Sequence, residues 1–183
     1  MDFHAIGLVE LTSIAKGFEV CDAMAKTANV SVLVAKSICP GKYIVMVGGD
    51  VAAVRQSVEA GEKLAGSSIV DRFVIPNVHP SVLPAISGGN SIDEVLALGI
   101  IETYSVAATI EAADAAVKAA GVIPLRMHLA FGIGGKSYVV LSGDIADMNA
   151  AVEAGSAVAS DKGFLVNRVV IPRPHKQLID QIM

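Results

Sequence analysis

The sequence predicts an α/β protein of the α+β kind, built from two tandem copies of one β-α-β-β-α-β module. The first observation is an internal repeat: AIGLVELTS at 5–13 returns as ALGIIETYS at 97–105, and VIPNVHP returns near the end as VIPRPHK. The second is that strand-like and helix-like patterns follow each other in the same order in both copies. The third is size, because 183 residues, 53% of them hydrophobic, suffice for two small domains.

Each copy begins with a strand, IGLVEL or LGIIET, that runs into a serine suited to cap a helix. The next segment has apolar residues at i, i+4, i+7 and i+11, which predicts a helix with one buried face. This assigns the thiol of Cys21 to the core, where free cysteine behaves as a small hydrophobe. The stripe comprises Ile14, Phe18, Cys21 and Ala25 in the first copy and Val106, Ile110, Ala113 and Val117 in the second.

The middle of each copy predicts a pair of strands around a tight turn, followed by a second helix and a last strand. In the first copy, VSVLVAKSIC and KYIVMVGG flank a Pro-Gly turn; in the second, LRMHLAF and SYVVLSG flank GIGG. Asp50 and Asp144 are placed to cap the second helices. The order matches a ferredoxin-like sandwich with both helices on one face of an open sheet.

The connection between the copies runs from 77 to 96 and contains a short predicted helix at PSVLPAI. We place the first domain at 1–88, the linker at 89–96 and the second domain at 97–183.

Composition excludes several classes of function. A net charge of -4, scattered basic residues and only three Tyr and five Phe do not predict a nucleic-acid binder. The N-terminal segment lacks the basic and apolar regions of a secretory signal, and apolar runs stop short of the roughly 18–20 residues of a membrane span. A cytoplasmic protein without a membrane partner is expected, and its two cysteines are expected to be thiols or ligands.

Two patterns suggest chemistry that their surroundings do not support. AFGIGGKS at 130–137 ends like a phosphate-binding loop, but a strand pattern follows where such a loop requires a helix. The four histidines, His4, His79, His128 and His175, show no i, i+3 or i+4 pairing typical of metal ligands, so structural or edge roles are expected.

The acidic residues likewise give no catalytic pair. Glu10 and Glu102 are repeat-equivalent, which indicates an architectural role rather than the two unlike environments of an acid-base pair. No catalytic set emerges, and the sequence does not predict an enzyme.

The second cysteine, Cys39, stands directly before the Pro40-Gly41 turn, where a side chain can face solvent or a partner. No cysteine occupies the corresponding turn of the second copy. In a monomer an incidental loop thiol is as good an interpretation as a functional one, because exposure alone does not make a thiol reactive.

The segments AIGLVELTSIAKGFEVCDAMAKTANV, GGDVAAV and VIPRPH resemble the bacterial microcompartment (BMC) shell domain, and the duplication resembles the tandem-domain shell proteins. Within that family, AKSICPGK, NVHPSVLPAIS and HLAFGIGGK are similar to shell proteins of propanediol utilisation. The resemblance covers nearly the whole chain. It implies a homotrimer whose six BMC domains form a flat pseudo-hexameric tile in a microcompartment shell, in contact with other shell proteins.

The resemblance also implies site residues and a cofactor. Three copies of Cys39 would meet on the three-fold axis and hold one [4Fe-4S] cluster per trimer, with a non-cysteine ligand on the fourth iron. The turns around the axis would line a central pore. The implied pore-lining residues are Ser37, Ile38, Cys39, Pro40, Gly41, Gly132, Ile133 and Gly134, and the implied tile-edge residues are Lys26, Lys118, His79, Arg173 and His175.

Two functions follow from this resemblance. The tile carries a redox cluster that passes electrons across the shell or delivers clusters to encapsulated redox enzymes, or it is a metabolite-gating pore lined by Cys39. The sequence leaves both open.

Overall fold

A four-stranded antiparallel sheet with two packed helices is present twice in the computed structural model of the chain, which describes residues 4–92 and 94–182. The chain divides into two compact units, Met1–Val78 with Ala130–Gly135 and His79–Leu129 with Lys136–Met183. The loop 130–135 therefore belongs to the second repeat in sequence but to the first unit by its contacts.

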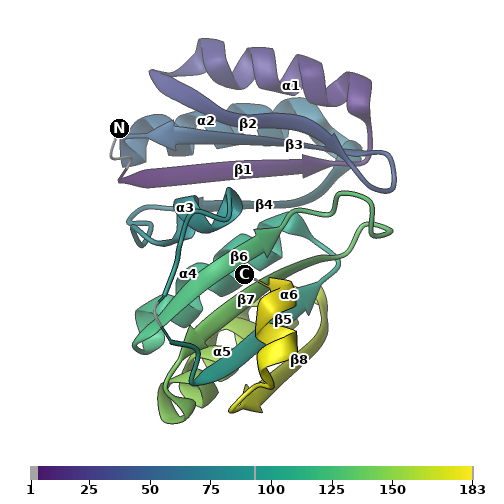
Figure 1. Ribbon diagram of the computed structural model, residues 1–183. Coiled ribbons are helices and arrows are strands. Elements are labelled where there is room, and N and C mark those ends of the chain that lie inside the picture. Colours follow the sequence, from purple (N-terminus) through teal and green to yellow (C-terminus); the bar gives the residue numbers. More distant parts are fainter. Residues whose placement is uncertain (1–3, 93, 183) are drawn as a thin grey trace. The chain divides into compact units, whose positions relative to one another are not determined.

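In the first unit the strand order is β2-β3-β1-β4, with every neighbouring pair antiparallel. Helices α1 and α2 pack on each other and on the sheet (Figure 1). This is the predicted β-α-β-β-α-β order. The elements are β1 (Ala5–Leu11), α1 (Ile14–Thr27), β2 (Val30–Ile38), β3 (Lys42–Gly49), α2 (Val51–Ala65) and β4 (Ile69–Ile75), with a short 3-10 turn at Gly66–Ser68 before β4.

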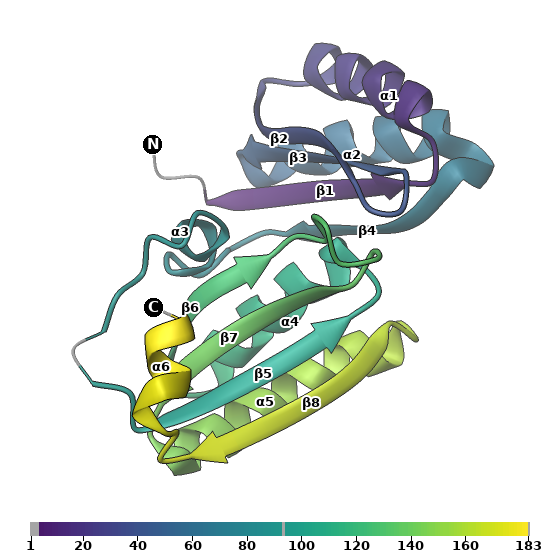
Figure 2. The same ribbon diagram turned by 45° about the vertical axis from the view of Figure 1, so that its right-hand side comes forward.

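The second unit repeats this arrangement with the order β6-β7-β5-β8. Figure 2 shows α4 and α5 behind the sheet and α6 in front of it. The C-terminal helix α6 was not predicted; its Ile182 packs against Leu98, Leu125 and Val140. The elements are α3 (Val82–Ile86), β5 (Ala97–Thr103), α4 (Val106–Ala119), β6 (Val122–His128), β7 (Ser137–Gly143), α5 (Ile145–Asp161), β8 (Leu165–Pro172) and α6 (Lys176–Ile182).

The predicted buried stripe is right for α4 and wrong for α1. All four predicted positions of α4 are buried, whereas Ile14, Phe18 and Ala25 of α1 are exposed and Cys21 is half-buried against the core. The buried residues of α1 are Gly17, Val20 and Met24. The reason is a close approach: a Cβ on Gly17 would lie 2.3 Å from a ring carbon of Tyr43, so the helix meets the sheet through its smallest residue.

The predicted helix caps are confirmed in the first helices and wrong in the second. The Ser13 and Ser105 hydroxyls accept hydrogen bonds from the N–H groups of Lys16 and Ala108, at 3.3 and 3.0 Å. Asp50 and Asp144 stand at the N-cap positions of α2 and α5 but make no side-chain cap hydrogen bond. The two aspartates therefore mark where the helices begin, although their side chains do not form the capping hydrogen bond.

Candidate functional site

Cys39 lies on the three-residue turn between β2 and β3. The turn is closed by the Gly41 N–H, which donates to the Ile38 carbonyl at 3.1 Å, and the Cys39–Pro40 peptide bond is cis. Ile38 is buried in the fold, Cys39 is half-buried, and Pro40 and Gly41 are exposed. The thiol therefore lies on a short turn of the first unit that one backbone hydrogen bond closes.

The loop 130–135 packs against this turn. The Cys39 N–H donates to the carbonyl of Ala130 at 2.9 Å, and the Gly132 N–H donates to the Cys39 Sγ at 3.4 Å. Gly135 comes so close that a Cβ there would lie 2.6 Å from the Pro40 Cδ. The sulfur therefore has an amide donor, supplied by a loop that the second repeat contributes.

A lysine follows each of the two loops and faces the repeat-equivalent glutamate. Lys42 pairs with Glu10, whose side chain is fully buried, and Lys136 pairs with Glu102 at 2.8 Å. The hydrogen bond to Glu102 and its charge raise the pKa of Lys136 above the ordinary value of 10.5. Each glutamate thus has a lysine partner at the start of the neighbouring strand, which fits an architectural role. The strand β7 begins directly after Lys136, so no helix follows as a phosphate-binding loop requires.

The remaining predicted pore residues, Ser37, Gly132, Ile133 and Gly134, are all exposed in one chain. Ile38 is the exception, because its side chain points into the fold.

The predicted edge lysines make matching ion pairs near the C-terminal ends of their helices. Lys26 pairs with Asp22 and Lys118 with Asp114, each at 2.6 Å. Lys26 precedes β2 and Cys39 follows it, so the two residues lie at opposite ends of that nine-residue strand.

The other three predicted edge residues differ in their surroundings. The His79 N–H donates to Asp114, and its ring Nδ1 lies 2.8 Å from the Ser81 hydroxyl. Arg173 is exposed and has a positive φ of 47°, and the exposed His175 ring accepts from the Gln177 N–H. The two repeat-equivalent histidines therefore have different environments.

Within residues 4–92 and 94–182, one chain has no group of three or more His, Cys, Asp or Glu side chains that could hold a metal ion. Cys21 and Cys39 are both free thiols. No helix in the same ranges is long and apolar enough to span a membrane.

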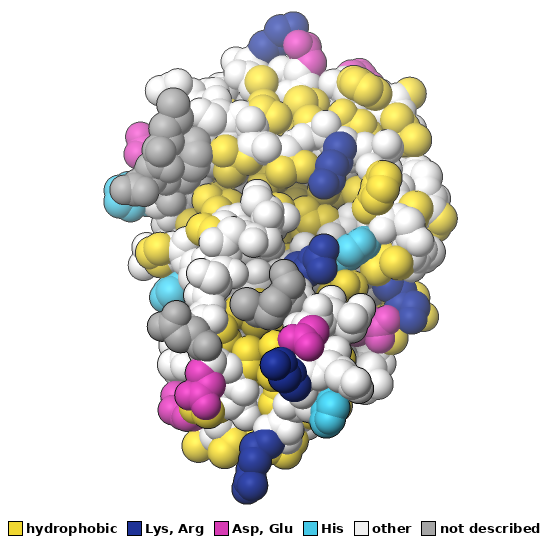
Figure 3. Space-filling model, viewed as in Figure 1, with side chains coloured by type: hydrophobic (Ala, Val, Ile, Leu, Met, Phe, Trp, Pro, Cys, Tyr) yellow, Lys and Arg dark blue, Asp and Glu magenta, His cyan; other side chains and the backbone are white. Residues whose placement is uncertain are grey.

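The two repeats differ in which faces they leave exposed. Phe18 on α1 is 63% exposed, whereas its repeat equivalent on α4, Ile110, is fully buried. Ile14 and Val106 differ in the same way. Hydrophobic side chains gather over the first unit in the view of Figure 3. The sequence does not reveal this difference, because both helices carry the same apolar pattern.

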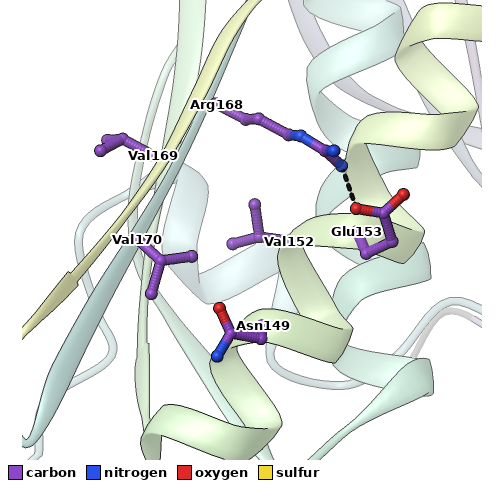
Figure 4. A pocket seen from close by; sticks show the side chains of 6 residues that line it. All are labelled: Asn149, Val152, Glu153, Arg168, Val169 and Val170. Carbon is purple, nitrogen blue, oxygen red and sulfur yellow. Dashed lines mark hydrogen bonds and ion pairs between the residues drawn. The ribbon is translucent and has the colours of Figure 1, made fainter.

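The second unit shows the opposite difference on its last strand. Val169 on β8 is 44% exposed, whereas its repeat equivalent on β4, Phe73, is 3% exposed. Beside Val169 a pocket of about 220 Å³ opens between α5 and β8. Figure 4 shows Val152 and Asn149 facing it, with Arg168 and Glu153 joined by an ion pair above. The exposed apolar surfaces of the two units therefore lie on different elements.

Each unit thus combines a four-stranded antiparallel sheet with two packed helices, and the Cys39 turn joins β2 to β3 in the first unit. The BMC domain family matches residues 5–78 and 97–174, and the chain belongs to this family. It is a structural shell protein of a bacterial microcompartment.

The relatives include tandem-domain proteins of the same length. The chain is 59% identical over 180 residues to the bacterial microcompartment shell protein PduT of Citrobacter freundii, and the match covers 98% of each chain. The crystal structure of a microcompartment protein from Desulfitobacterium hafniense superposes with a TM-score of 0.86 at 51% identity, covering 98% of this chain and 99% of that one. The fused permuted hexameric shell protein MSM0275 shares the fold, with a TM-score of 0.66 at 20% identity over 86% and 84% of the two chains.

Proposed function

We propose that the protein is a trimeric shell tile that carries one [4Fe-4S] cluster on its three-fold axis, with one Cys39 thiolate from each chain. The observation that carries the proposal is the placement of Cys39 on an exposed turn, with an amide donor at its sulfur. The cluster would pass electrons across the shell or be delivered to redox enzymes inside it.

The exposed faces support a closed ring of chains. A symmetric dimer buries the same patch on both partners, whereas two different complementary patches join copies head to tail and form a ring when the rotation between copies closes. Here the apolar stripe of α1 and the surface around Val169 of β8 are different patches. Six shell domains per tile, as the family resemblance implies, correspond to three such chains.

The residues of the Cys39 turn fit an iron-sulfur ligand. Iron in these clusters is held by cysteine thiolates, and hydrogen bonds to the sulfur adjust the potential. Three chains supply three thiolates for four irons, which leaves the fourth iron to a different ligand. Iron also offsets the repulsion that three neighbouring thiolates would otherwise experience, because it binds the deprotonated form.

Anaerobic reconstitution tests the cluster directly. Wild-type protein should bind about four irons and four sulfides per trimer and show the visible absorbance of a cluster. Cys39→Ser should bind none and remain a trimer, whereas Cys21→Ser should keep the cluster and lose only core stability. If wild-type protein takes up no iron or sulfide, the redox function is refuted.

The oligomeric state is tested separately by light scattering. Wild-type protein should be a stable trimer, and Phe18→Asp should lower the mass because it places a charge on the exposed stripe of α1. Thr27→Asp, on the opposite side of the same helix, is the control and should leave the mass unchanged. A monomeric wild-type protein would refute the tile.

Contacts between tiles, including those with other shell proteins, are proposed to use Lys26, Lys118, His79, Arg173 and His175. Replacing both lysines by alanine should impair incorporation into shells and leave the trimer intact. Unchanged incorporation would remove the edge assignment.

A gated pore for metabolites is the second candidate, and the exposure of Pro40, Gly41 and Ile133 favours it. In this function Cys39 lines the opening and holds no cluster. The reconstitution experiment separates the two candidates, because only the first requires iron and sulfide.

A further inference from the structure

The loop 130–135 contacts the Cys39 turn at three points, one of them at the sulfur itself. The Ala130 carbonyl accepts from the Cys39 N–H at 2.9 Å, and the Gly132 N–H donates to the Cys39 Sγ at 3.4 Å. Gly135 lies against the turn: a Cβ added to it would be 2.6 Å from the Pro40 Cδ and 3.1 Å from the Cys39 carbonyl oxygen. The loop therefore contacts the N–H, the sulfur and the carbonyl of Cys39, and the Pro40 ring.

We propose that this loop is a positioning element for the Cys39 sulfur, and that the Gly132 amide adjusts the reduction potential of a cluster held there. A backbone N–H aimed at a metal-bound thiolate raises the reduction potential of the cluster. The consequence for the potential rests on the cluster proposed above. The positioning itself concerns the metal-free protein and stands independently.

The glycines of the loop explain how the amide reaches the sulfur. Gly132, Gly134 and Gly135 all have positive φ values, of 75°, 67° and 87°, which other residues adopt only with strain. Only Gly135 also lacks room for a side chain, since a Cβ on Gly132 or Gly134 would meet nothing within 4 Å. Gly135 therefore sets how closely the loop can approach the turn.

This difference provides a matched pair of variants. Gly134→Ala and Gly135→Ala impose a similar backbone cost, but only Gly135→Ala pushes the loop away from Pro40. A third variant, Cys39→Ala, removes the acceptor of the Gly132 N–H and leaves the loop sequence unchanged.

The first experiment measures hydrogen exchange of the Gly132 amide by NMR in the full-length, metal-free protein. Exchange should be several-fold faster in Cys39→Ala and in Gly135→Ala than in wild type, and close to wild type in Gly134→Ala. Unchanged exchange in Cys39→Ala would show that the sulfur does not accept this hydrogen bond, and the proposal would be overturned.

The second experiment measures the midpoint potential of the reconstituted cluster. Gly135→Ala should shift it to a more negative value than Gly134→Ala, because the amide has moved away from the sulfur. Equal potentials in the two variants would overturn the role of the loop in adjusting the potential of the cluster. If no variant and no wild-type protein holds a cluster, the proposed function fails, while the exchange experiment still decides the positioning.

Discussion

Replacing Glu10 by Gln should destabilise the protein far more than the same change at its repeat equivalent, Glu102. The Glu10 side chain is fully buried and that of its partner Lys42 is 12% exposed, whereas Glu102 and Lys136 are 30% and 41% exposed. Removing one charge of a buried pair costs about 3–5 kcal/mol, because the remaining charge stays desolvated. An exposed pair contributes only about 0.2–1 kcal/mol.

These energies correspond to distinguishable melting shifts. For a chain of this length, 1 kcal/mol shifts Tm by about 2–4 °C, so Glu10→Gln should lower Tm by about 6–20 °C and Glu102→Gln by at most about 4 °C. The two variants carry the same substitution facing the same type of partner. Burial is therefore the variable that the comparison isolates.

Thermal unfolding followed by circular dichroism measures both variants at one protein concentration and one scan rate, because assembly makes Tm concentration-dependent. Light scattering below the transition checks that both variants have the wild-type mass. Equal Tm shifts, or a larger shift for Glu102→Gln, would refute the reasoning that burial makes the Glu10 pair the more costly one to break.

Three further predictions concern single side chains. Gly17→Ala should lower the free energy of unfolding by up to about 2 kcal/mol, because overpacking against Tyr43 costs about 1–3 kcal/mol and helix propensity returns about 1; a stabilised variant would contradict the close approach. Burial raises the pKa of Cys21 above its ordinary value of 9.0. In a variant without the other cysteine, Cys21 should therefore be alkylated more slowly than free cysteine near neutral pH, and an equal rate would contradict its burial. Because the pKa of Lys136 is raised in the folded state, its pairing with Glu102 stabilises the fold fully below pH 10.5, and this contribution is lost as pH rises through the raised value. Glu102→Gln should abolish that part of the pH dependence of the free energy of unfolding, and an unchanged profile would contradict the pairing.

The sequence predicts the fold well because the repeat shows each pattern twice. A pattern that is ambiguous once, such as a short apolar run, becomes a strand when its equivalent has the same neighbours in the same order. The strand pairs, both sheets and the serine caps at Ser13 and Ser105 follow from such local signals. The helix α6 is only seven residues long and lies after the last repeated strand, so the repeat gives no second copy of its pattern and the sequence does not predict it.

Tertiary packing limits what local patterns predict about burial. The stripe of α1 was assigned to the core because Ile14 and Phe18 are apolar, but the contact with the sheet is made through Gly17. Hydrophobic periodicity identifies which side chains are apolar on one face of a helix, and it does not distinguish a face buried in the core from one exposed on the surface. For the same reason the Gly132 amide at the Cys39 sulfur has no sequence signal, since ninety-three positions separate the two residues.

Divergence between the repeats would allow the proposed trimer to carry a single cluster on its axis. At the offset that aligns the first helices, Cys39 corresponds to Phe131. If both repeats had the cysteine, a tile of six domains would place six thiols around the axis, more than the four irons of one cluster can use and with greater repulsion among their thiolates. With the cysteine in one repeat only, the proposed trimer has three thiolates, and the loop of the other repeat is free to supply the Gly132 amide. A Phe131→Cys variant should therefore keep the trimer and hold no more than one cluster, and a doubled iron content would contradict the view that three thiolates already complete the site.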